Sequence, residues 1–318
     1  MIEDRGHRDT CRQSVATVTV AYNGAELLRL QIAALLRQTR PIQEIVIVDN
    51  QSKDSTVQIL AKEFPNVTIL HMKENLGQAG GWAAGLAYAA LEKKHDWIWS
   101  FDQDSVPELD ALELLLSGYE QIPSGQRIGM LAPIPFHGEP RADYLPMLWR
   151  NGFVKVGRDD MSKQPTWYAD LVIASGCLVS SEVVQRVGVP RADFFMDFCD
   201  FEYCLRVRSQ GYKIAVITKC LLSHKIGNAQ HIRLLGYDWA WPDYPAWREY
   251  YLARNITYAA WWLYPKARIF AMGHLLRHAC AVLMFSKNKR ASLRRLSQGL
   301  KDGKAGRMGI RFLPGSIS

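Results

Sequence analysis

The first hundred residues alternate between strand-like and helix-like segments. Wholly apolar or β-branched runs are typical of buried strands, and apolar residues between them recur at helical spacing. The expected strands are 14–21, 44–48, 67–71 and one beginning at Trp97, and the expected helices are 26–37, 55–64 and 78–92. Short alternating units of this kind form a parallel sheet covered by helices, which binds ligands at the carboxyl ends of its strands.

Three of the expected strands end in polar residues, which a parallel sheet places along one edge. These residues are Tyr22, Asn23, Asp49, Asn50, Asp102, Gln103 and Asp104. Because strand side chains alternate between faces, Asp102 and Asp104 project to the same side and can reach one hard cation. The stretch equally fits an acidic turn before a helix that starts at 105–108. Both interpretations stay open on this stretch alone.

The segment 75–85 is rich in glycine and precedes an expected helix. Glycines at 77, 80 and 81 allow a ligand to approach the backbone, and amides at a helix N-terminus favour phosphate oxygens. Close packing of the helix on the sheet by small residues is the favoured alternative for this segment alone. The chain has neither G-x-G-x-x-G after its first strand nor G-K-[ST], which argues against a dinucleotide enzyme or a P-loop.

The middle of the chain is less regular. We expect a strand at 127–132, a proline-rich loop at 133–146 and two strands around Ser175-Gly176 within 168–180.

A second acidic cluster and a histidine follow. From Asp200 the pattern predicts a helix on whose surface Glu202 pairs with Arg206 four residues later. One of Asp197 and Asp200, set among aromatic neighbours, could serve as a general base. His224 follows an expected strand at 212–222; a lone histidine is more often structural, but here it could be a third metal ligand beside the aspartates.

The basic character of the chain belongs to its C-terminus. The net charge is +8, and residues 264–318 hold twelve Lys and Arg against the single acid Asp302, so the rest of the chain carries about −3. Because no nucleic-acid motif accompanies these charges, an anionic membrane surface is the better partner, and no nucleic acid is expected. The polar first residues show no secretory signal. The six cysteines show no paired metal-binding spacing, and we infer a reducing cytosol.

The segment 269–285 is mostly apolar but contains His274, Arg277 and His278. These charges, and fewer than roughly 20 apolar residues, make it a poor transmembrane helix. We expect an amphipathic helix lying in the membrane interface, with aromatic anchors nearby. A helical appendage packed on the catalytic domain is the alternative.

Seven groups of residues, in this order, resemble the family 2 inverting glycosyltransferases of the GT-A fold, specifically the bacterial rhamnosyltransferase-like members. The groups are 19–24, 45–50 with Ser52 and Asp54, 74–77, 101–105, Ser175-Gly176, 195–202 with Arg206 and Gly211, and 223–227. The resemblance implies a GT-A fold: an α/β domain with a mostly parallel central sheet, helices on both faces, and a basic, aromatic-rich helical C-terminal appendage. The expected parts are a polar tail at 1–13, a catalytic domain at 14–235 divided after residue 105, and the appendage at 236–318.

The resemblance also implies roles for matching residues. It relates the nucleotide-sugar donor to Tyr22, Asn23, Asp49, Asn50, Asn75, Gly77, Asp102 and Gln103, the first three at the base and ribose. It relates Mg²⁺ or Mn²⁺ to Asp102, Asp104 and His224, with Asp104 and His224 as the more direct ligands. It identifies Asp200 as the general base, with Asp197 as the alternative, and relates Ser175, Gly176, Trp247 and Arg254 to the acceptor.

The expected function is metal-dependent inverting transfer of a sugar to a lipid-linked or polysaccharide acceptor in cell-surface glycan synthesis. The favoured donor is dTDP-L-rhamnose, although Gly80-Gly81-Trp82 looks more like the galactofuranosyltransferases, which leaves a UDP-sugar open. The expected location is peripheral, at the cytoplasmic face of the inner membrane, and a homo-oligomer stays open. The competing hypotheses are a nucleotidyltransferase or sugar-nucleotide phosphohydrolase, and a catalytically inactive, membrane-associated binding protein.

Overall fold

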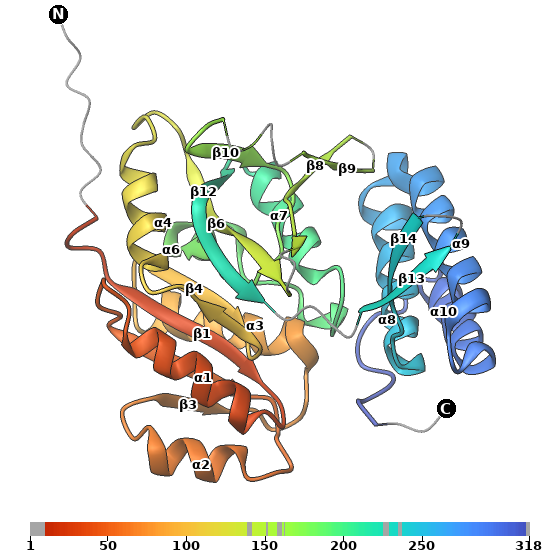
Figure 1. Ribbon diagram of the computed structural model, residues 1–318, viewed down its shortest axis with the longest axis horizontal. Coiled ribbons are helices and arrows are strands. Elements are labelled where there is room, and N and C mark those ends of the chain that lie inside the picture. The colour runs from red at the N-terminus through yellow and green to blue at the C-terminus, as the bar shows by residue number, and fades with distance from the viewer. Residues whose placement is uncertain are drawn as a thin grey trace, which may run out of the picture. The chain divides into compact units, whose positions relative to one another are not determined.

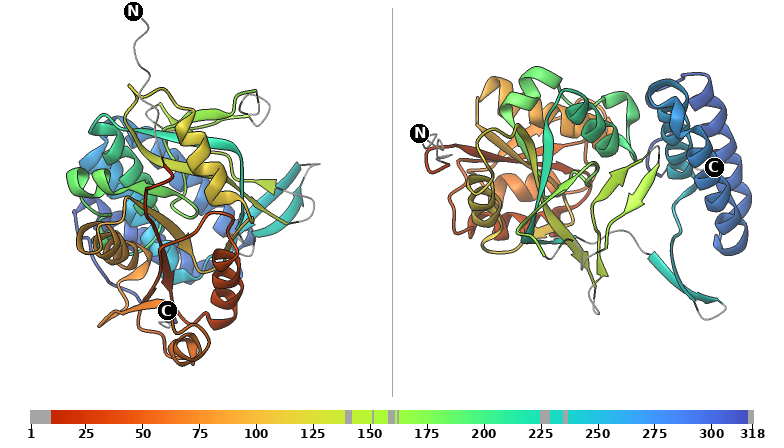
Figure 2. Two further views of the ribbon diagram at one scale, coloured as in Figure 1. Left: turned by 90° about the vertical axis from the view of Figure 1, so that its left-hand side faces the viewer. Right: turned by 90° about the horizontal axis from the view of Figure 1, so that it is seen from above.

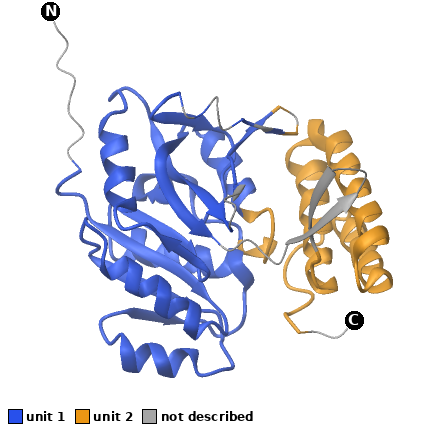
Figure 3. Cartoon of the chain, viewed as in Figure 1, with its two compact units in different colours: residues 1–149, 154–191, 200–225 blue, residues 150–153, 192–199, 226–318 orange. Residues whose placement is uncertain are grey.

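The computed structural model describes residues 10–138, 142–150, 152–157, 161, 163–224, 229–234 and 237–315. Most of the expected tail at 1–13, the part of the 223–227 landmark after His224, and the expected boundary at 235 therefore lie outside the described residues. The chain divides into two compact units (Figure 3). Unit 1 comprises 1–149, 154–191 and 200–225, and unit 2 comprises 150–153, 192–199 and 226–318.

Unit 1 begins with the expected parallel sheet (Figure 1). Its strands are β1 (Val15–Ala21), β2 (Glu44–Asp49), β3 (Thr68–His71) and β4 (Trp97–Asp102), in the spatial order β4-β1-β2-β3. All three pairings are parallel. The helices between them are α1 (Ala25–Leu36), α2 (Thr56–Glu63) and α3 (Gly77–Ala87), which continues into the π-helical turn η1 (Tyr88–Glu92). The alternation predicted from the sequence is confirmed.

Helices α1 and α3 cover opposite faces of this sheet (Figures 1 and 2). Thr19 of β1 bonds to Gln31 of α1, whereas Val18 and Val20 face α3. A Cβ added at Gly81 would collide with Val20, and one at Gly85 with Val18. Close helix-to-sheet packing therefore explains these two glycines of the 75–85 segment.

The second half of unit 1 extends the sheet with strands of both directions. These are β5 (Ser105–Pro107), β6 (Ile128–His137), β7 (Ala142–Asp143), β10 (Thr166–Ala169), β11 (Leu178–Ser180) and β12 (Lys213–His224). Beyond β4 the order is β11-β6-β12-β10, with β5 paired to β12 and β7 to β6. The helices are α4 (Ala111–Glu120), α6 (Ser181–Val187) and α7 (Cys199–Ser209), and β8 (Met147–Trp149) pairs with β9 (Phe153–Lys155).

Two expectations for this half are wrong. Residues 105–108 do not start a helix; Ser105–Pro107 form β5, and α4 begins at Ala111. The strand expected at 127–132 runs on to His137, through prolines that had suggested a loop. Pro133 and Pro135 are tolerated because β11 pairs with β6 only at Met130 and Leu131, while β12 continues along the other edge.

Unit 2 is mainly helical, as expected for the appendage. It contains α8 (Ala246–Tyr258), continued by η3 (Ala259–Leu263) and η4 (Pro265–Ala267), then α9 (Arg268–Phe285) and α10 (Lys289–Lys304). It also contains the hairpin of β13 (Ala229–Leu234) and β14 (Tyr237–Pro242), and the short helix η2 (Ala192–Phe194). Added Cβ atoms at Gly299 and Gly303 of α10 would meet the backbone of α8, so these glycines allow the two helices to pack closely.

The span Pro265–Phe285 has the length and apolar composition of a membrane-crossing helix, with mean hydropathy 1.2. This differs from the sequence expectation, which counted its charges against it. Buried core helices of soluble proteins can have the same composition, so the surroundings of α9 matter more than its hydropathy.

Candidate active site

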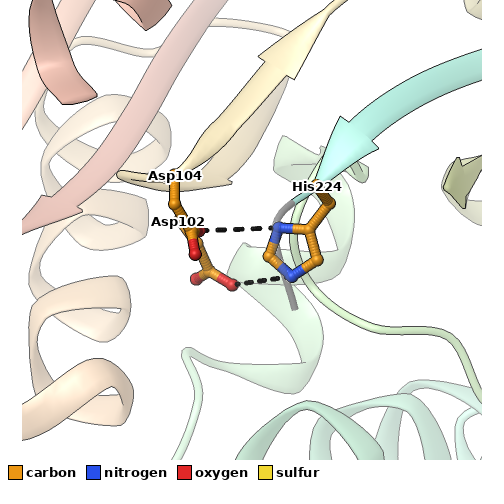
Figure 4. A group of neighbouring side chains, drawn as sticks. All are labelled: Asp102, Asp104 and His224. Atoms are coloured by element: carbon orange, nitrogen blue, oxygen red, sulfur yellow. Dashed lines mark ion pairs between the residues drawn. The ribbon is translucent and has the colours of Figure 1, made fainter. Parts of the chain in front are cut away.

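The pairing of β5 with β12 creates a cluster of two aspartates and a histidine. Strand β4 ends at Asp102, the chain turns through Asp104, and Ser105 then pairs directly with His224, the last residue of β12. Figure 4 shows the three side chains facing one another. His224 Nε2 lies 3.8 Å from Asp102 Oδ2, and His224 Nδ1 lies 3.6 Å from Asp104 Oδ1. Residues 119 positions apart in the chain thus share one site.

Two buried serines orient this cluster. Ser105 Oγ lies 2.6 Å from His224 Nδ1 and 2.6 Å from Ser175 Oγ, and Ser175 Oγ accepts the backbone N–H of Asp102 at 3.0 Å. Because the bond to Ser105 engages Nδ1, Nε2 is the ring nitrogen available to a metal ion. Neighbours that orient a ligand in this way fix its tautomer and its direction.

Gln31 of α1 holds the turn between β4 and β5. Its side chain is fully buried, and its Nε2 donates to the carbonyls of Asp102 and Ser105 at 2.7 Å each. Its Oε1 accepts from Thr19 at 2.7 Å. The sequence analysis missed Gln31, although a glutamine among the buried positions Leu28, Ile32 and Leu35 of α1 was the available signal.

The cluster fits Mg²⁺ or Mn²⁺. One ligand atom from each of Asp102, Asp104 and His224 lies within 4.8 Å of the others. The two carboxylates are about one-third exposed, whereas the histidine is buried, so a cation here would keep positions open toward solvent. Carboxylate oxygens with one imidazole suit these cations, and the imidazole favours Mn²⁺. Gln78, at the start of α3, also donates to Asp102.

Asp49 ends β2 and Asn50 follows it, at the same edge of the sheet as this cluster, as the sequence predicted. In the sheet Asp49 is paired with Ala21, whose neighbour Val20 is paired with Asp102. Asp49 Oδ1 accepts the backbone N–H of Ser52 at 3.1 Å, and Asp49 and Asn50 are both buried.

The other expected donor residues shape the loops around Asp49. Asn50 holds the loop before α3, accepting from Leu76 N and donating to Gly77 O, both at 2.9 Å. Asn75 caps the same turn through Gly77 N at 2.9 Å. Asn23, in the left-handed region, accepts from Lys53 N at 2.7 Å.

Gln103 ties the ends of β1 and β4 together. Its Oε1 accepts from Tyr22 N at 2.9 Å, and its Nε2 donates to Tyr22 O at 3.3 Å. A Cβ at Gly24 would collide with this side chain. Gln103 therefore holds the backbone of Tyr22 in place, while the Tyr22 side chain is partly exposed.

Ser175 and Gly176, which the sequence analysis related to the acceptor, contact the cluster of Asp102, Asp104 and His224 from inside the fold. Ser175 is buried and bonded as described above. Gly176 has φ of 80°, donates to Ser100 O at 2.7 Å, and would collide with Leu222 if it had a side chain.

Asp200 and Asp197 belong to different parts of the fold. Asp200 lies in the first turn of α7 in unit 1, and its charge contributes, after burial and Cys204, to raising the pKa of Cys177, which follows Ser175-Gly176. Asp197 lies in unit 2 and accepts two-pronged hydrogen bonds from Arg248 at 2.8–3.2 Å. The ion pair with Arg248 thus engages Asp197 within unit 2. Glu202 pairs with Arg206 at 2.9 Å, as predicted, but Glu202 is buried and does not lie on the helix surface.

The loop 192–199, directly before Asp200, is held by α8. Phe195, Asp197 and Phe198 have φ of 62°, 57° and 66°, a region that side-chain-bearing residues seldom adopt. Asn255 Nδ2 donates to the carbonyls of Phe194, Met196 and Asp197 at 3.0, 2.6 and 2.8 Å.

Arg254, which the sequence analysis related to the acceptor, completes this support. It is fully buried, and its guanidinium donates to the carbonyls of Asp193, Phe194 and Gly309. Trp247, partly buried, packs against Tyr251, whose ring stacks on Phe195 at 4.6 Å between centroids. These α8 residues act on the protein's own loop.

A comparison with family models decides what kind of domain carries this site. Residues 17–154 match the model described as glycosyl transferase family 2. The chain contains a family 2 glycosyltransferase domain. The match begins in β1 and includes the ends of β1, β2 and β4, and thus both metal-cluster aspartates.

The relatives of this glycosyltransferase include a rhamnosyltransferase and galactofuranosyltransferases. It is 28% identical over 245 residues to the dTDP-rhamnosyl transferase RfbF of Shigella flexneri, covering 76% of this chain and 78% of that one. It is 26% identical over 308 residues to the galactofuranosyltransferase GlfT1 of Mycobacterium tuberculosis, covering 92% and 98%. GlfT1 of Mycolicibacterium smegmatis is 25% identical over 233 residues, covering 71% and 76%.

Solved structures place the glycosyltransferase in the GT-A fold. S. aureus TarS, residues 1–349, in complex with UDP, aligns with TM-score 0.53 over 95% of this chain and 98% of that one. GalNAc-T7 with UDP, GalNAc and Mn²⁺ aligns with TM-score 0.59 over 95% of this chain and 59% of that one. Both are 12% identical, so the likeness concerns the fold.

Proposed function

We propose that the chain is a metal-dependent, inverting glycosyltransferase that uses a nucleotide-diphospho-sugar donor. The observation that carries this proposal is the cluster of Asp102, Asp104 and His224 at the end of β4, in the sheet that also brings Asp49 to the same edge. The structural neighbours bound to UDP, one of them with Mn²⁺, support a donor of this kind.

The residues present suit a single displacement. Asp102, Asp104 and His224 would hold Mg²⁺ or Mn²⁺, which when bound offsets the charge that develops on the departing nucleoside diphosphate. The Asp200 carboxylate would take the proton of the acceptor hydroxyl while that oxygen bonds to the anomeric carbon. The bond from that carbon to the diphosphate oxygen breaks in the same step, so the configuration inverts and no nucleophile on the protein is required.

The donor we favour is dTDP-L-rhamnose, and UDP-galactofuranose is the second candidate. RfbF, with its dTDP-rhamnosyl activity, supports the first, and the two GlfT1 proteins support the second at nearly the same identity. The acceptor we propose is a lipid-linked or polysaccharide chain in cell-surface glycan synthesis, at the cytoplasmic face of the membrane.

Thermal unfolding with dTDP and with UDP, each with and without Mn²⁺, tests this proposal. A ligand that binds only the folded protein stabilises it by about 2.7 kcal/mol at a hundred times its Kd. We expect a Mn²⁺-dependent rise of the midpoint, larger with dTDP, that Asp104→Asn abolishes and Glu113→Gln, an exposed acid of α4, leaves intact. A larger rise with UDP would transfer the proposal to a UDP-sugar. No rise with either nucleotide would overturn it.

Identifying the leaving group distinguishes glycosyl transfer from nucleotidyl transfer and from hydrolysis of the sugar nucleotide. Transfer releases a nucleoside diphosphate, whereas a nucleotidyltransferase releases pyrophosphate and a phosphohydrolase releases a nucleoside monophosphate. We expect the diphosphate, formed in proportion to an acceptor supplied as a membrane glycolipid extract.

A further inference from the structure

Helix α9 has two faces of different character. Its inner face packs within unit 2, where the buried residues are Ala271, Leu275, His278, Ala281 and Val282. Its outer face exposes Ile269, Met272, Leu276, Cys280, Leu283 and Met284, which we call the α9 stripe. Ile269 is 89% exposed and Leu276 is 67% exposed. The helix therefore differs from an ordinary amphipathic surface helix, because its outward face is apolar as well as its inner face.

The α9 stripe is continuous along the helix. Successive members follow at steps of three, four, four, three and one residues, which keeps them on one side at 3.6 residues per turn. Monomeric soluble proteins seldom expose contiguous apolar surface of this kind, and where they do it marks a site of interaction with a protein or a membrane.

Cations border the stripe, whereas the acids Glu249 and Asp243, which contact α9, bond to His278 and Ser286. Arg268 and Arg277 are exposed on opposite sides of it, and Lys266 and Lys287 are exposed near its two ends. The sequence contains no Asp or Glu between Glu249 and Asp302. Anionic phospholipid headgroups complement this pattern. A second copy of α9 would bring cations against cations, so the charges disfavour self-pairing.

The inner face of α9 argues against a helix that crosses a membrane. His278 Nε2 lies 2.6 Å from Glu249 Oε2, and both side chains are buried, which raises the pKa of the Glu249 carboxyl. A spanning α9 would carry this polar pair and Arg277 into hydrocarbon, which is costly. An interfacial helix submerges the outward stripe alone and keeps its arginines at headgroup level.

We propose that the α9 stripe docks unit 2 on an anionic phospholipid bilayer, with Arg268 and Arg277 at the headgroup phosphates. The proposal depends on unit 2 alone. It would survive a failure of the donor assignment, because membrane binding is measured without nucleotide or acceptor.

Sedimentation of the full chain with lipid vesicles tests this surface. We expect binding to phosphatidylcholine vesicles that contain phosphatidylglycerol, weaker binding to phosphatidylcholine alone, and further weakening at high salt. Ile269→Glu with Leu276→Glu should lower the partition coefficient about tenfold or more, because two apolar side chains are lost from the lipid contact. Both positions are exposed, so the thermal midpoint should stay unchanged.

The matched control is Leu30→Glu on α1 of unit 1. Leu30 is 64% exposed, nearly the same fraction as Leu276. The residue next to it, Arg29, is paired with the acids Glu26 and Glu63, so its surroundings are not cationic. We expect no change in partitioning. Undiminished binding of the double variant would overturn the proposal. So would an oligomer of the native chain that sediments without vesicles and dissociates in the double variant, because the stripe would then join copies of the chain.

Discussion

Ser105 contributes to the cluster of Asp102, Asp104 and His224 through its neighbours. Its hydroxyl bonds to both His224 and Ser175, so it links the histidine ligand to the segment that holds the Asp102 backbone. A serine that orients a histidine acts on ligand basicity and direction without touching the ion. Its position in β5, directly opposite His224, makes this contact unavoidable once the strands pair.

Ser105→Ala should lower the Mn²⁺ affinity about 10- to 100-fold, the usual loss when a group behind a metal ligand is removed. Electron paramagnetic resonance of free Mn²⁺, titrated in the presence of nucleotide, measures this affinity. Ser117→Ala on α4, whose hydroxyl bonds to its own helix, is the control. An affinity equal to that of the native protein would show that Ser105 is irrelevant to the metal.

Replacing Asp200 and Asp197 separately distinguishes the two candidate bases. Asp200→Asn should reduce the transfer rate about 10²- to 10⁴-fold and leave nucleotide affinity unchanged, since a general base acts on the acceptor. Asp197→Asn should mainly weaken the pair with Arg248 and lower the free energy of unfolding by on the order of 1 kcal/mol. Transfer rates and urea unfolding measure both effects, and the reverse pattern would make Asp197 the base.

At the scale of elements, the support given by α8 to loop 192–199 is the contact that the sequence least suggested. Three residues of this loop occupy the left-handed region, where each costs on the order of 1 kcal/mol. Asn255 and Arg254 offset that cost by binding the carbonyls that such a backbone turns toward α8. The helix thereby determines the path of the chain into α7 and Asp200.

Asn255→Asp should reveal this support, because it keeps the oxygen that accepts from Arg254 at 2.8 Å but removes both N–H donors. We expect a loss of about 1–3 kcal/mol in the free energy of unfolding, the penalty for buried carbonyls left without donors. The transfer rate should fall while nucleotide affinity does not. Asn288→Ala, an exposed asparagine of unit 2, is the control. A variant as stable and active as the native chain would refute the idea.

At the scale of the whole molecule, much of unit 1 could be predicted from local patterns. Strand ends and polar clusters are local features, and the parallel order of β1, β2 and β4 then brings Asp49 and Asp102 to one edge. What escaped prediction depends on long-range pairing. Strand β5 looked like a helix start because Ser105 and Pro107 are acceptable there, and only its pairing with β12 makes it a strand.

The same limit explains why the surroundings of Ser175, Arg254 and α9 could not be predicted. Ser175 and Arg254 match family positions, but a sequence match does not show whether a side chain turns to the solvent or to the chain's own carbonyls. The pattern of α9 identified an apolar helix, and which of its faces is covered depends on Glu249 of α8, which bonds to His278. Tertiary partners decide such matters.

The chain enters unit 2 at 150–153 and again at 192–199, returns to unit 1 each time, and finally enters unit 2 after residue 225. Each unit is consequently built from separate segments of the sequence, so neither can be exchanged between proteins as one continuous segment. A fragment cut at residue 225 would keep the loop 192–199 but lose Arg254 and Asn255, which hold it. Recombination between relatives would have to transfer α8 together with this loop. The C-terminal appendage and the loop before Asp200 are therefore expected to be inherited jointly.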